Sequence, residues 1–355
     1  MPILIIDNRH YASICFLKVS YMALHCIRFR IGIPIGILFF FIASCTNYIN
    51  DTDILNYRSF SAELYTSDKR LAGIALRKFS QNNKEYYLAV DPQTLQTEII
   101  PTERYLIVKM PFREIRARNK NLNYFKAINR AEKNSRVFQN AGITHIAGRG
   151  AVYLTADLCP TGRPLDRSFF TDLIREYGTY RKPVPLSLSI TGRWMENHPN
   201  DLKWIISLEK QKEISITWIN HTNSHYYKKN LPLLKNFLLS EGSRIDDEIL
   251  QVETRLIESG IPPTVFFRFP GLVSTKEVFL QVTDFGLIPV GSDAWLMKNQ
   301  QPAEGSIILV HANGNEPGGI QRLRALVQKK KKDIMNGRWV LRELREGINE
   351  SMKTY

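Results

Sequence analysis

Two histidines follow a predicted strand at a spacing that suits metal binding. His221 and His225 stand in the segment 220–225, directly after an apolar run at 215–219. If the chain turns helical there, a spacing of four places both imidazoles on one face, where they can hold one ion. Two histidines at this spacing also occur as ordinary surface residues. The pair therefore predicts a divalent metal site, with zinc as the expected ion, only if other residues support it.

Further residues able to do chemistry also stand where predicted strands end. Taken singly, each has a simpler interpretation: a surface ion pair for the arginine, core filling for the tryptophan and a rim position for the histidine. Functional residues of a parallel barrel gather at the C-terminal ends of its strands, so their common position favours one site. These residues are Asp157, Arg268 with the turn residues Pro270 and Gly271, Trp295, and His311.

The elements that must position these residues alternate between strand and helix. From about residue 141, short apolar runs are separated by helical patterns, including a helix over 244–259 that Gly260 ends. Such alternation is typical of a parallel sheet in an α/β domain, either barrel-like or doubly wound. The expected strands are 151–155, 185–190, 215–219, 265–268, 287–290 and 307–310.

The chain before this domain has a different texture. Residues 59–112 contain short alternating apolar runs broken by turn signals, which predicts a small β-rich module. Residues 113–148 are predicted to form a basic helical connector, and the polar stretch 46–58 a tether. The large α/β domain is then expected over residues 149–345.

The order of the strand-end motifs resembles that of the polysaccharide deacetylases of the NodB-homology type, carbohydrate esterase family 4. The resemblance covers about residues 150–312. Its most specific match is Asn220-His221-Thr222 with His225, and two further matches are Arg268-Phe-Pro-Gly271 and Leu309-Val-His311. It implies a deformed (β/α) barrel and metal-dependent hydrolysis of N-acetyl or O-acetyl groups from an envelope or extracellular polysaccharide.

The same resemblance implies a role for each matching residue. His221 and His225 would be the metal ligands and Asp157 the general base, held ionised by Arg268. His311 would protonate the departing amine. The substrate-binding residues would be Trp295, as the wall of the acetyl pocket, with Pro270 and Gly271.

Two positions depart from the family pattern. Leu158 stands where the family has a second aspartate that binds the metal, and leucine cannot ligate an ion. Asp157 could bind the metal itself, Cys159 could supply a thiolate that zinc would accept, or water could complete a two-histidine site. A small buried residue in a turn is the simpler interpretation of Cys159. Ala294 stands where the family usually has aspartate, although Asp293 is adjacent.

The N-terminus predicts export. Arg28 and Arg30 precede an apolar run at 31–43 that meets Ser44-Cys45, which together form a secretory signal. The segment ending at Cys45 also resembles a bacterial lipobox. Lipidated Cys45 would anchor the protein to a membrane of the cell envelope. A plain cleaved signal and an uncleaved anchor are the alternatives, and Met22 could be the true start.

Net charge adds little about partners. The chain has a formal charge of +14 and a pI of about 9.6, so it should attract polyanions. No nucleic-acid-binding motif accompanies the charge, and the run Lys329–Lys332 is interpreted as a solvated helix face. The expected partners are a polysaccharide with N-acetylated sugars and, through Cys45, a membrane; nucleic acid is not expected.

Two other functions remain open on sequence. A catalytically impaired glycan-binding protein derived from a deacetylase would explain the loss of a ligand at Leu158. A metal-dependent amidohydrolase acting on a small amide would use the same residues on the same barrel.

Overall fold

The computed structural model describes residues 53–355. The predicted signal segment, the lipobox with Cys45, the alternative start at Met22 and most of the predicted tether lie outside the described residues. Within 53–355, no helix is both long and apolar enough to span a bilayer.

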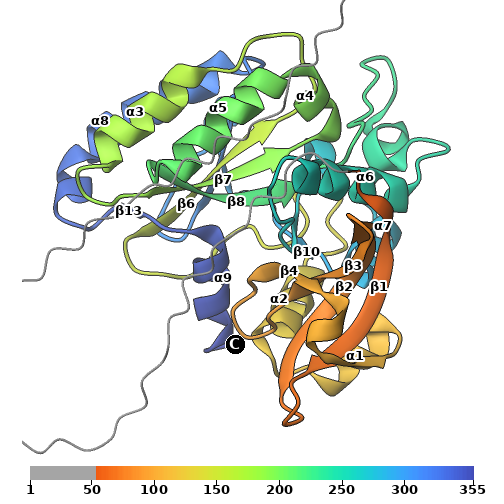
Figure 1. Cartoon of the computed structure of the whole chain (residues 1–355). Helices are drawn as coiled ribbons and strands as arrows, with labels where there is room; N and C mark the ends of the chain where they lie inside the picture. Colours follow the sequence, from red (N-terminus) through yellow and green to blue (C-terminus); the bar gives the residue numbers. More distant parts are fainter. Residues whose placement is uncertain (1–52) are drawn as a thin grey trace, which may run out of the picture. The chain divides into compact units, whose positions relative to one another are not determined.

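An antiparallel sheet forms the first part of the described chain (Figure 1). Its strand order is β4-β3-β2-β1-β5, and buried residues lie on both faces of its central strands, whereas β5 is exposed. Ala75 in β2 packs on one face, whereas Ile74 and Leu76 pack on the face that joins the core of the parallel sheet. The strands are β1 (Leu55–Tyr65), β2 (Leu71–Gln81), β3 (Lys84–Val90), β4 (Thr97–Pro101) and β5 (Leu106–Lys109).

Two helices connect this sheet to the rest of the chain. They are α1 (Phe112–Arg118) and α2 (Asn123–Glu132), and Tyr124 and Phe125 of α2 are fully buried. The predicted helical connector therefore contains helix only in its first part. Its later residues run in an irregular path that forms an isolated parallel bridge from Ile143 to Val290.

A parallel sheet forms the larger part of the described chain and confirms the predicted α/β class. The strand order is β10-β9-β8-β7-β6-β12-β11, with β13 paired to the start of β6. The short segment 290–293 joins the two outer strands β10 and β11, so the sheet curls into an incomplete, deformed barrel. The strands are β6 (Ala151–Leu158), β7 (Val184–Ile190), β8 (Ile214–Asn220), β9 (Phe266–Phe267), β10 (Ile288–Pro289), β11 (Ala294–Trp295), β12 (Ile307–His311) and β13 (Val340–Leu341).

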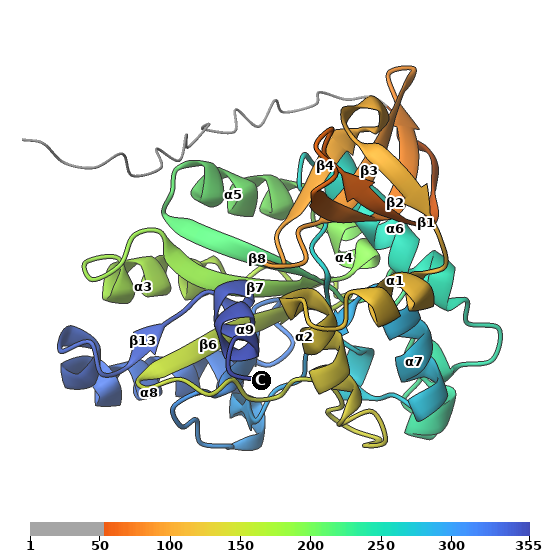
Figure 2. The same ribbon diagram turned by 90° about the horizontal axis from the view of Figure 1, so that it is seen from below.

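Helices α3, α5 and α8 cover one face of the parallel sheet (Figures 1 and 2). At the start of α3 the Asp166 carboxylate accepts a hydrogen bond from the backbone NH of Phe169. Helices α5 and α8 have no such side-chain cap and begin instead with a proline in the first turn. The helices are α3 (Arg167–Tyr177), α4 (Gly192–Asn197), α5 (Pro199–Lys210), α6 (Ile245–Glu258), α7 (Lys276–Asp284), α8 (Pro317–Met335) and α9 (Leu344–Met352). Short 3-10 turns are η1 (Thr102–Arg104), η2 (Leu233–Lys235), η3 (Phe237–Leu239), η4 (Pro270–Leu272) and η5 (Leu296–Lys298).

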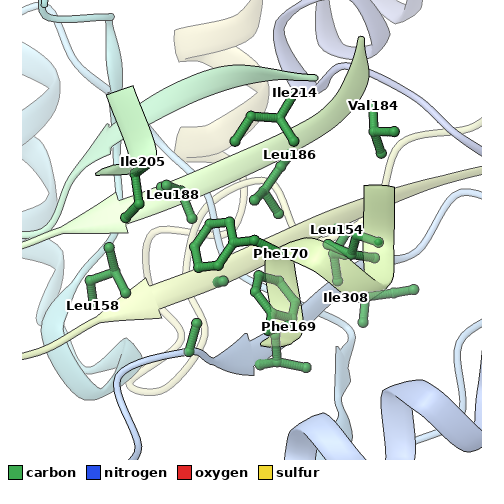
Figure 3. Packing of buried hydrophobic residues seen from close by; sticks show 14 of the residues in the cluster. Leu154, Leu158, Phe169, Phe170, Val184, Leu186, Leu188, Ile205, Ile214 and Ile308 are labelled. Carbon is green, nitrogen blue, oxygen red and sulfur yellow. The ribbon is translucent and has the colours of Figure 1, made fainter. Parts of the chain in front are cut away.

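The core between the sheet and these helices is apolar and closely packed. Figure 3 shows Leu154 and Leu158 of β6 on the same side as Phe169 and Phe170 of α3. Residues one apart on a strand point to opposite faces, so Leu154, Ala156 and Leu158 belong to this core. The residues between them belong to the barrel interior, where the candidate site lies.

The antiparallel sheet and the barrel form one compact unit. A buried ion pair joins them: Arg77 of β2 donates from Nε and Nη2 to Glu253 of α6, at 2.7 and 2.9 Å. Tyr57 of β1 donates to the same carboxylate at 2.9 Å. The apolar core on this side also contains residues of both parts.

Candidate active site

The polar residues predicted at strand ends meet at one edge of the parallel sheet. Asp157 of β6 lies in register with His311 of β12, and Asn220, the last residue of β8, with Phe267 of β9. His221 and Arg268 follow directly in the chain. Because parallel strands bring their carboxyl ends to the same edge, four segments distant in sequence supply one site.

Asp157 and Arg268 form a buried ion pair at the centre of this edge. Arg268 Nη1 donates to Asp157 Oδ1 at 2.6 Å and to Thr155 Oγ1 at 2.8 Å. The backbone carbonyls of Val290 and Gly291 accept from its other nitrogens, so Arg268, which is wholly buried, is held on several sides. Burial raises the pKa of Asp157, but Arg268 above all, with His221 and His311, outweighs it and lowers that pKa.

His221 is fixed in a ring orientation that suits metal binding. Its Nδ1 lies 2.9 Å from the backbone carbonyl of Arg268. A carbonyl only accepts, so Nδ1 carries the proton and the lone pair of neutral His221 is on Nε2. Nε2 lies 3.6 Å from Asp157 Oδ2 and 3.6 Å from Cys159 Sγ. Burial opposes protonation of His221, but Asp157 and Cys159 outweigh it and raise its pKa.

His225 reaches the site through a turn and not through a helix. The segment after β8 is irregular, and Thr222 and His225 have φ angles of 69° and 45°. The expectation that the two histidines share a helical face is therefore wrong, because the chain leaves the strand in left-handed backbone conformations. Their rings nevertheless lie 4.9 Å apart between centroids. Non-glycine residues with such backbone angles cluster at functional sites.

The neighbouring helix holds this turn in place. Glu248 of α6 accepts hydrogen bonds from the backbone NH and the hydroxyl of Ser224. Asn220 accepts from the NH of Thr222 at 3.1 Å and donates to the carbonyl of Ile249 at 3.0 Å. The position of His225 thus depends on Asn220, which belongs to the sequence motif, and on Glu248, which the motif does not mark.

Cys159 lies inside the site, and Leu158 does not. Side chains alternate along β6, so Asp157 and Cys159 point inward, whereas Leu158 is fully buried in the core under α3 (Figure 3). Asn313 donates to the backbone carbonyl of Cys159 at 2.8 Å and fixes the chain there. Interpreting Cys159 as only a small residue in a turn does not account for its place beside His221.

Three side chains in this cluster could hold a metal ion. One ligand atom from each of Cys159, His221 and His225 lies within 4.8 Å of the other two. Nε2 of His225 is buried and, in the part of the chain that the structure describes, has no hydrogen-bond partner. A buried unpaired nitrogen costs about 1–3 kcal/mol, and a bound cation would satisfy it. The donor set, one sulfur and two imidazoles, fits zinc.

The charge balance favours a thiolate at Cys159. Burial raises the pKa of the thiol, but His225, together with His221 and His311, outweighs this and brings the pKa well below its usual value. A deprotonated cysteine is the form that binds metals.

His311 interacts with Cys159 and also has an acidic partner. Its Nδ1 forms an ion pair with Glu316 at 2.8 Å. Trp295 Nε1 donates to the same carboxylate at 3.0 Å, and the indole lies 5.9 Å from the His311 ring. Burial lowers the pKa of His311, but Cys159 and Glu316 outweigh it and raise that pKa well above its usual value.

The residues around Trp295 differ from what the family pattern requires. Ala294 is fully buried in the core. The adjacent Asp293 lies 2.8 Å from His145 Nδ1 and accepts from the backbone NH of Ile307 at 2.9 Å. Asp293 therefore joins two segments of the chain and does not take the place of the missing aspartate in the site.

Pro270 and Gly271 lie in the turn η4 and have a packing explanation. Gly271 has a φ angle of 61°, and a Cβ atom there would come within 2.5 Å of the Phe237 ring. Phe237 also packs edge-on against His225, with ring centroids 5.1 Å apart. The glycine thus allows Phe237 to support a candidate metal ligand, whereas contact of Pro270 or Gly271 with substrate stays a prediction.

Sequence reasoning did not find three residues of this site. Thr155 holds Arg268, Glu316 pairs with His311, and Glu248 anchors the turn of His225. Only Glu316 carried a usable signal, since it is the first acidic residue after His311 in the loop that follows β12.

The first part of the described chain matches a family model. Residues 55–132, from β1 to the end of α2, match the model described as the RP012 protein N-terminal domain. The match covers the antiparallel sheet and the two connecting helices. The residues of the candidate site lie beyond it.

The chain is also similar to solved structures of family 4 carbohydrate esterases. One, from Bacillus anthracis, is 16% identical with a TM-score of 0.43, covering 63% of this chain and 91% of that chain. Another, from Bacillus subtilis, is 16% identical with a TM-score of 0.42, covering 62% and 88%. A pseudoenzyme of the same family from Bacillus anthracis is 14% identical with a TM-score of 0.41, covering 61% and 69%. At these values, assigning a function depends on the residues of this chain.

Proposed function

We propose that this protein is a metal-dependent hydrolase that removes acetyl groups from the amino sugars of a polysaccharide. One observation carries the proposal. The candidate ligands Cys159, His221 and His225 lie beside the ion pair of Asp157 with Arg268, and His311 completes the site. These are the groups that amide hydrolysis needs: a metal site, a base, and an acid for the leaving nitrogen.

Asp157 is suited to act as the general base. Its Oδ1 accepts from Arg268, while its Oδ2 faces His221 Nε2 at 3.6 Å, beyond hydrogen-bond distance. Arg268 holds the carboxylate ionised and fixes its plane. Oδ2 can therefore take a proton from a water molecule that attacks the acetamide carbonyl.

His221 and His225 would hold the metal, and its third ligand is a separate question. When bound, a divalent ion polarises the carbonyl and lowers the pKa of water, which makes water nucleophilic at neutral pH. The carbonyl of Arg268 keeps the His221 ring in the tautomer that presents Nε2 to the ion.

His311 is suited to act as the general acid. Its ion pair with Glu316 stabilises the imidazolium and orients the ring. The imidazolium would donate its proton to the amide nitrogen as the carbon–nitrogen bond breaks. Water oxygen then ends on the acetyl carbon, acetate leaves, and the sugar keeps a free amine.

A glycan of the cell envelope is the proposed substrate. Trp295 stands 5.9 Å from His311 and could form the wall of the acetyl pocket. The predicted signal and lipobox at Cys45 favour an enzyme anchored to a bacterial membrane. Membrane fractionation with Cys45→Ala tests the anchor: full retention of the variant on membranes would exclude lipidation as its cause.

An acetate-release assay tests the activity. The purified protein is supplied with zinc and given N-acetylglucosamine oligomers, peptidoglycan or small amides. We expect release from a polymer, and a loss of about 10²–10⁴-fold in Asp157→Ala together with a loss of at least that size in His221→Ala. Lys331→Ala, on the exposed face of α8, is the matched control. Full activity in either site variant would contradict the mechanism.

Two outcomes would favour the rival functions. Zinc binding without acetate release, together with retained glycan binding, would favour a binding protein. Release from small amides alone would favour a different amidohydrolase. The case for the first rival is weaker if Cys159, which lies in the site while Leu158 lies in the core, supplies the ligand that is missing at position 158.

A further inference from the structure

We propose that Cys159 is the third protein ligand of the metal site, which makes it a Cys-His-His site selective for zinc and similar ions. The proposal deepens the proposed function, because it rests on the same site. The observation behind it is the compact group formed by Cys159, His221 and His225, whose ligand atoms lie within 4.8 Å of one another.

The strand geometry explains why residue 159 and not residue 158 contributes. Asp157, Leu158 and Cys159 alternate in direction along β6 and just after it. The alternation sends Leu158 into the core with Phe169 and places Cys159 on the side of the barrel interior. Within this segment, only Asp157 and Cys159 can therefore supply a ligand in place of the missing aspartate.

Asp157 is already engaged elsewhere. Its Oδ1 accepts from Arg268 at 2.6 Å, and the group of potential ligands in the described chain does not include it. Using Oδ2 as a ligand would leave the site without a free base. Cys159 has no such ion pair with an arginine: its Sγ lies 3.6 Å from His221 Nε2 and interacts with the site histidines His225 and His311.

Each of the two histidines places one ring nitrogen near the sulfur. His221 Nδ1 is occupied by the Arg268 carbonyl, so Nε2 is the atom that points to Cys159. Nε2 of His225 is buried and has no hydrogen-bond partner among residues 53–355, so it is available as a second nitrogen ligand. Sulfur and imidazole nitrogen are both ligand atoms that zinc accepts, and three protein ligands leave the fourth position open, as in catalytic zinc sites.

The sulfur ligand has a consequence for metal choice. Thiolates are soft ligands that favour zinc, whereas oxygen ligands favour magnesium, calcium and manganese. This site should therefore take zinc or cobalt(II) and exclude magnesium. Exchanging Cys159 for aspartate should move the preference toward harder ions while keeping a ligand at the same position.

Cobalt(II) is the probe that reports the ligand directly. The full chain is stripped of metal with a chelator and titrated with cobalt(II) alone while absorption is recorded. We expect a thiolate-to-cobalt charge-transfer band in the near ultraviolet for the unaltered protein and for Cys45→Ser. The band should be absent in Cys159→Asp, although cobalt still binds.

Zinc affinity gives an independent measurement. Loss of a residue that only supports a ligand costs about 10–100-fold in affinity, so Cys159→Ala should weaken zinc binding by about 100-fold or more. Circular dichroism establishes that each variant is folded. If Cys159→Ala does not fold, Cys159→Asp and Cys159→Ser carry the test.

Leu158→Asp is the control for the position of the ligand. It restores two adjacent aspartates in sequence, but the added carboxylate would enter the apolar core. We expect lower stability, no gain in zinc affinity and an unchanged charge-transfer band.

The outcomes separate this inference from the proposed function. Absence of the band in the unaltered protein, or unchanged zinc affinity in Cys159→Ala, overturns the ligand assignment even if acetate is released. A band that depends on Cys159, with no acetate released from any glycan, supports the ligand and contradicts the function. Reaction of Cys159 with an acetyl group in metal-free protein would instead show a cysteine nucleophile and overturn the inference.

Discussion

In the part of the chain that the structure describes, two arginine–carboxylate pairs are fully buried, and their carboxylates have different sets of hydrogen-bond partners. Arg77 and Glu253 join the antiparallel sheet to α6, and both side chains are 1% exposed. Arg268 and Asp157 lie in the barrel, with side chains 0% and 4% exposed. Burial and charge are thus nearly the same in the two regions, so neither can explain why one pair lies in a candidate active site.

The difference lies in the carboxylate oxygens. Glu253 accepts from Arg77 on both oxygens and from Tyr57 on one of them. Asp157 gives one oxygen to Arg268 and directs the other toward His221 without a hydrogen bond. A fully paired carboxylate stabilises an interface, whereas one with a free oxygen remains able to take a proton. In this protein, a buried carboxylate oxygen without a hydrogen bond is therefore a more useful sign of function than burial or charge.

The largest expected effect is on activity. Replacing Arg268 by methionine removes the charge that keeps Asp157 ionised, so we expect acetate release to fall by about 10²–10⁴-fold. Arg77→Met is the matched control, and its rate per folded molecule should not change. Equal losses in both variants would mean that the comparison between the two pairs is wrong.

Both single replacements should also destabilise the fold. Removing one partner of a buried pair leaves the other charge uncompensated, which costs about 3–5 kcal/mol in the free energy of unfolding. Urea denaturation at neutral pH measures the loss. Replacing Arg77 and Glu253 by methionine and Tyr57 by phenylalanine together should recover most of it; a still larger loss would contradict this view of the interface.

The two regions should lose their contribution to the free energy of unfolding at opposite ends of the pH range. Arg268 holds the pKa of Asp157 below its usual 3.8, so the unfolded chain binds this proton first as pH falls. The stability that ionised Asp157 contributes is present above pH 3.8 and is lost as pH falls through the lower pKa of the folded protein. Burial and then Glu253 raise the pKa of Tyr57 well above its usual 10.0. The stability that protonated Tyr57 contributes is present below pH 10 and is lost as pH rises toward the pKa of the folded protein.

Two variants isolate these contributions. The free energy of unfolding is measured against pH by urea denaturation. Asp157→Asn should flatten the acid limb and leave the alkaline limb, and Tyr57→Phe should do the reverse. A change in the alkaline limb for Asp157→Asn, or in the acid limb for Tyr57→Phe, would contradict the assignment of these two groups to the two limbs.

The smallest effect concerns the partner of His311. Glu316→Gln removes a charge-assisted contact worth about 1.5 kcal/mol, so the rate should fall by about tenfold. The pKa of His311 should also fall, which moves the alkaline limb of the rate profile to lower pH. The exposed Glu304, replaced by glutamine, is the control. An unchanged profile in Glu316→Gln would exclude this role.

Much of the fold followed from local patterns. Alternating strands and helices predicted the parallel α/β domain, and β6, β7, β8 and β12 lie close to the expected ranges. The chain after β8 could not be predicted in the same way. Its left-handed turn at Thr222 and His225 depends on Glu248, which is 24 residues from its partner Ser224, and on Asn220, which bonds both to Thr222 in the turn and to Ile249, 29 residues away.

By itself, the sequence determined which chemical groups stand at strand ends and in what order. It supplied Asp157, His221, Arg268 and His311, and strand periodicity made their convergence predictable. Only the tertiary structure decided which partners these groups have. It placed Cys159 with the two histidines and Leu158 in the core, paired Glu316 with His311, and satisfied Glu253 across 176 residues of chain. Backbone periodicity is a local property, whereas hydrogen-bond partners are chosen by strand register and long-range packing.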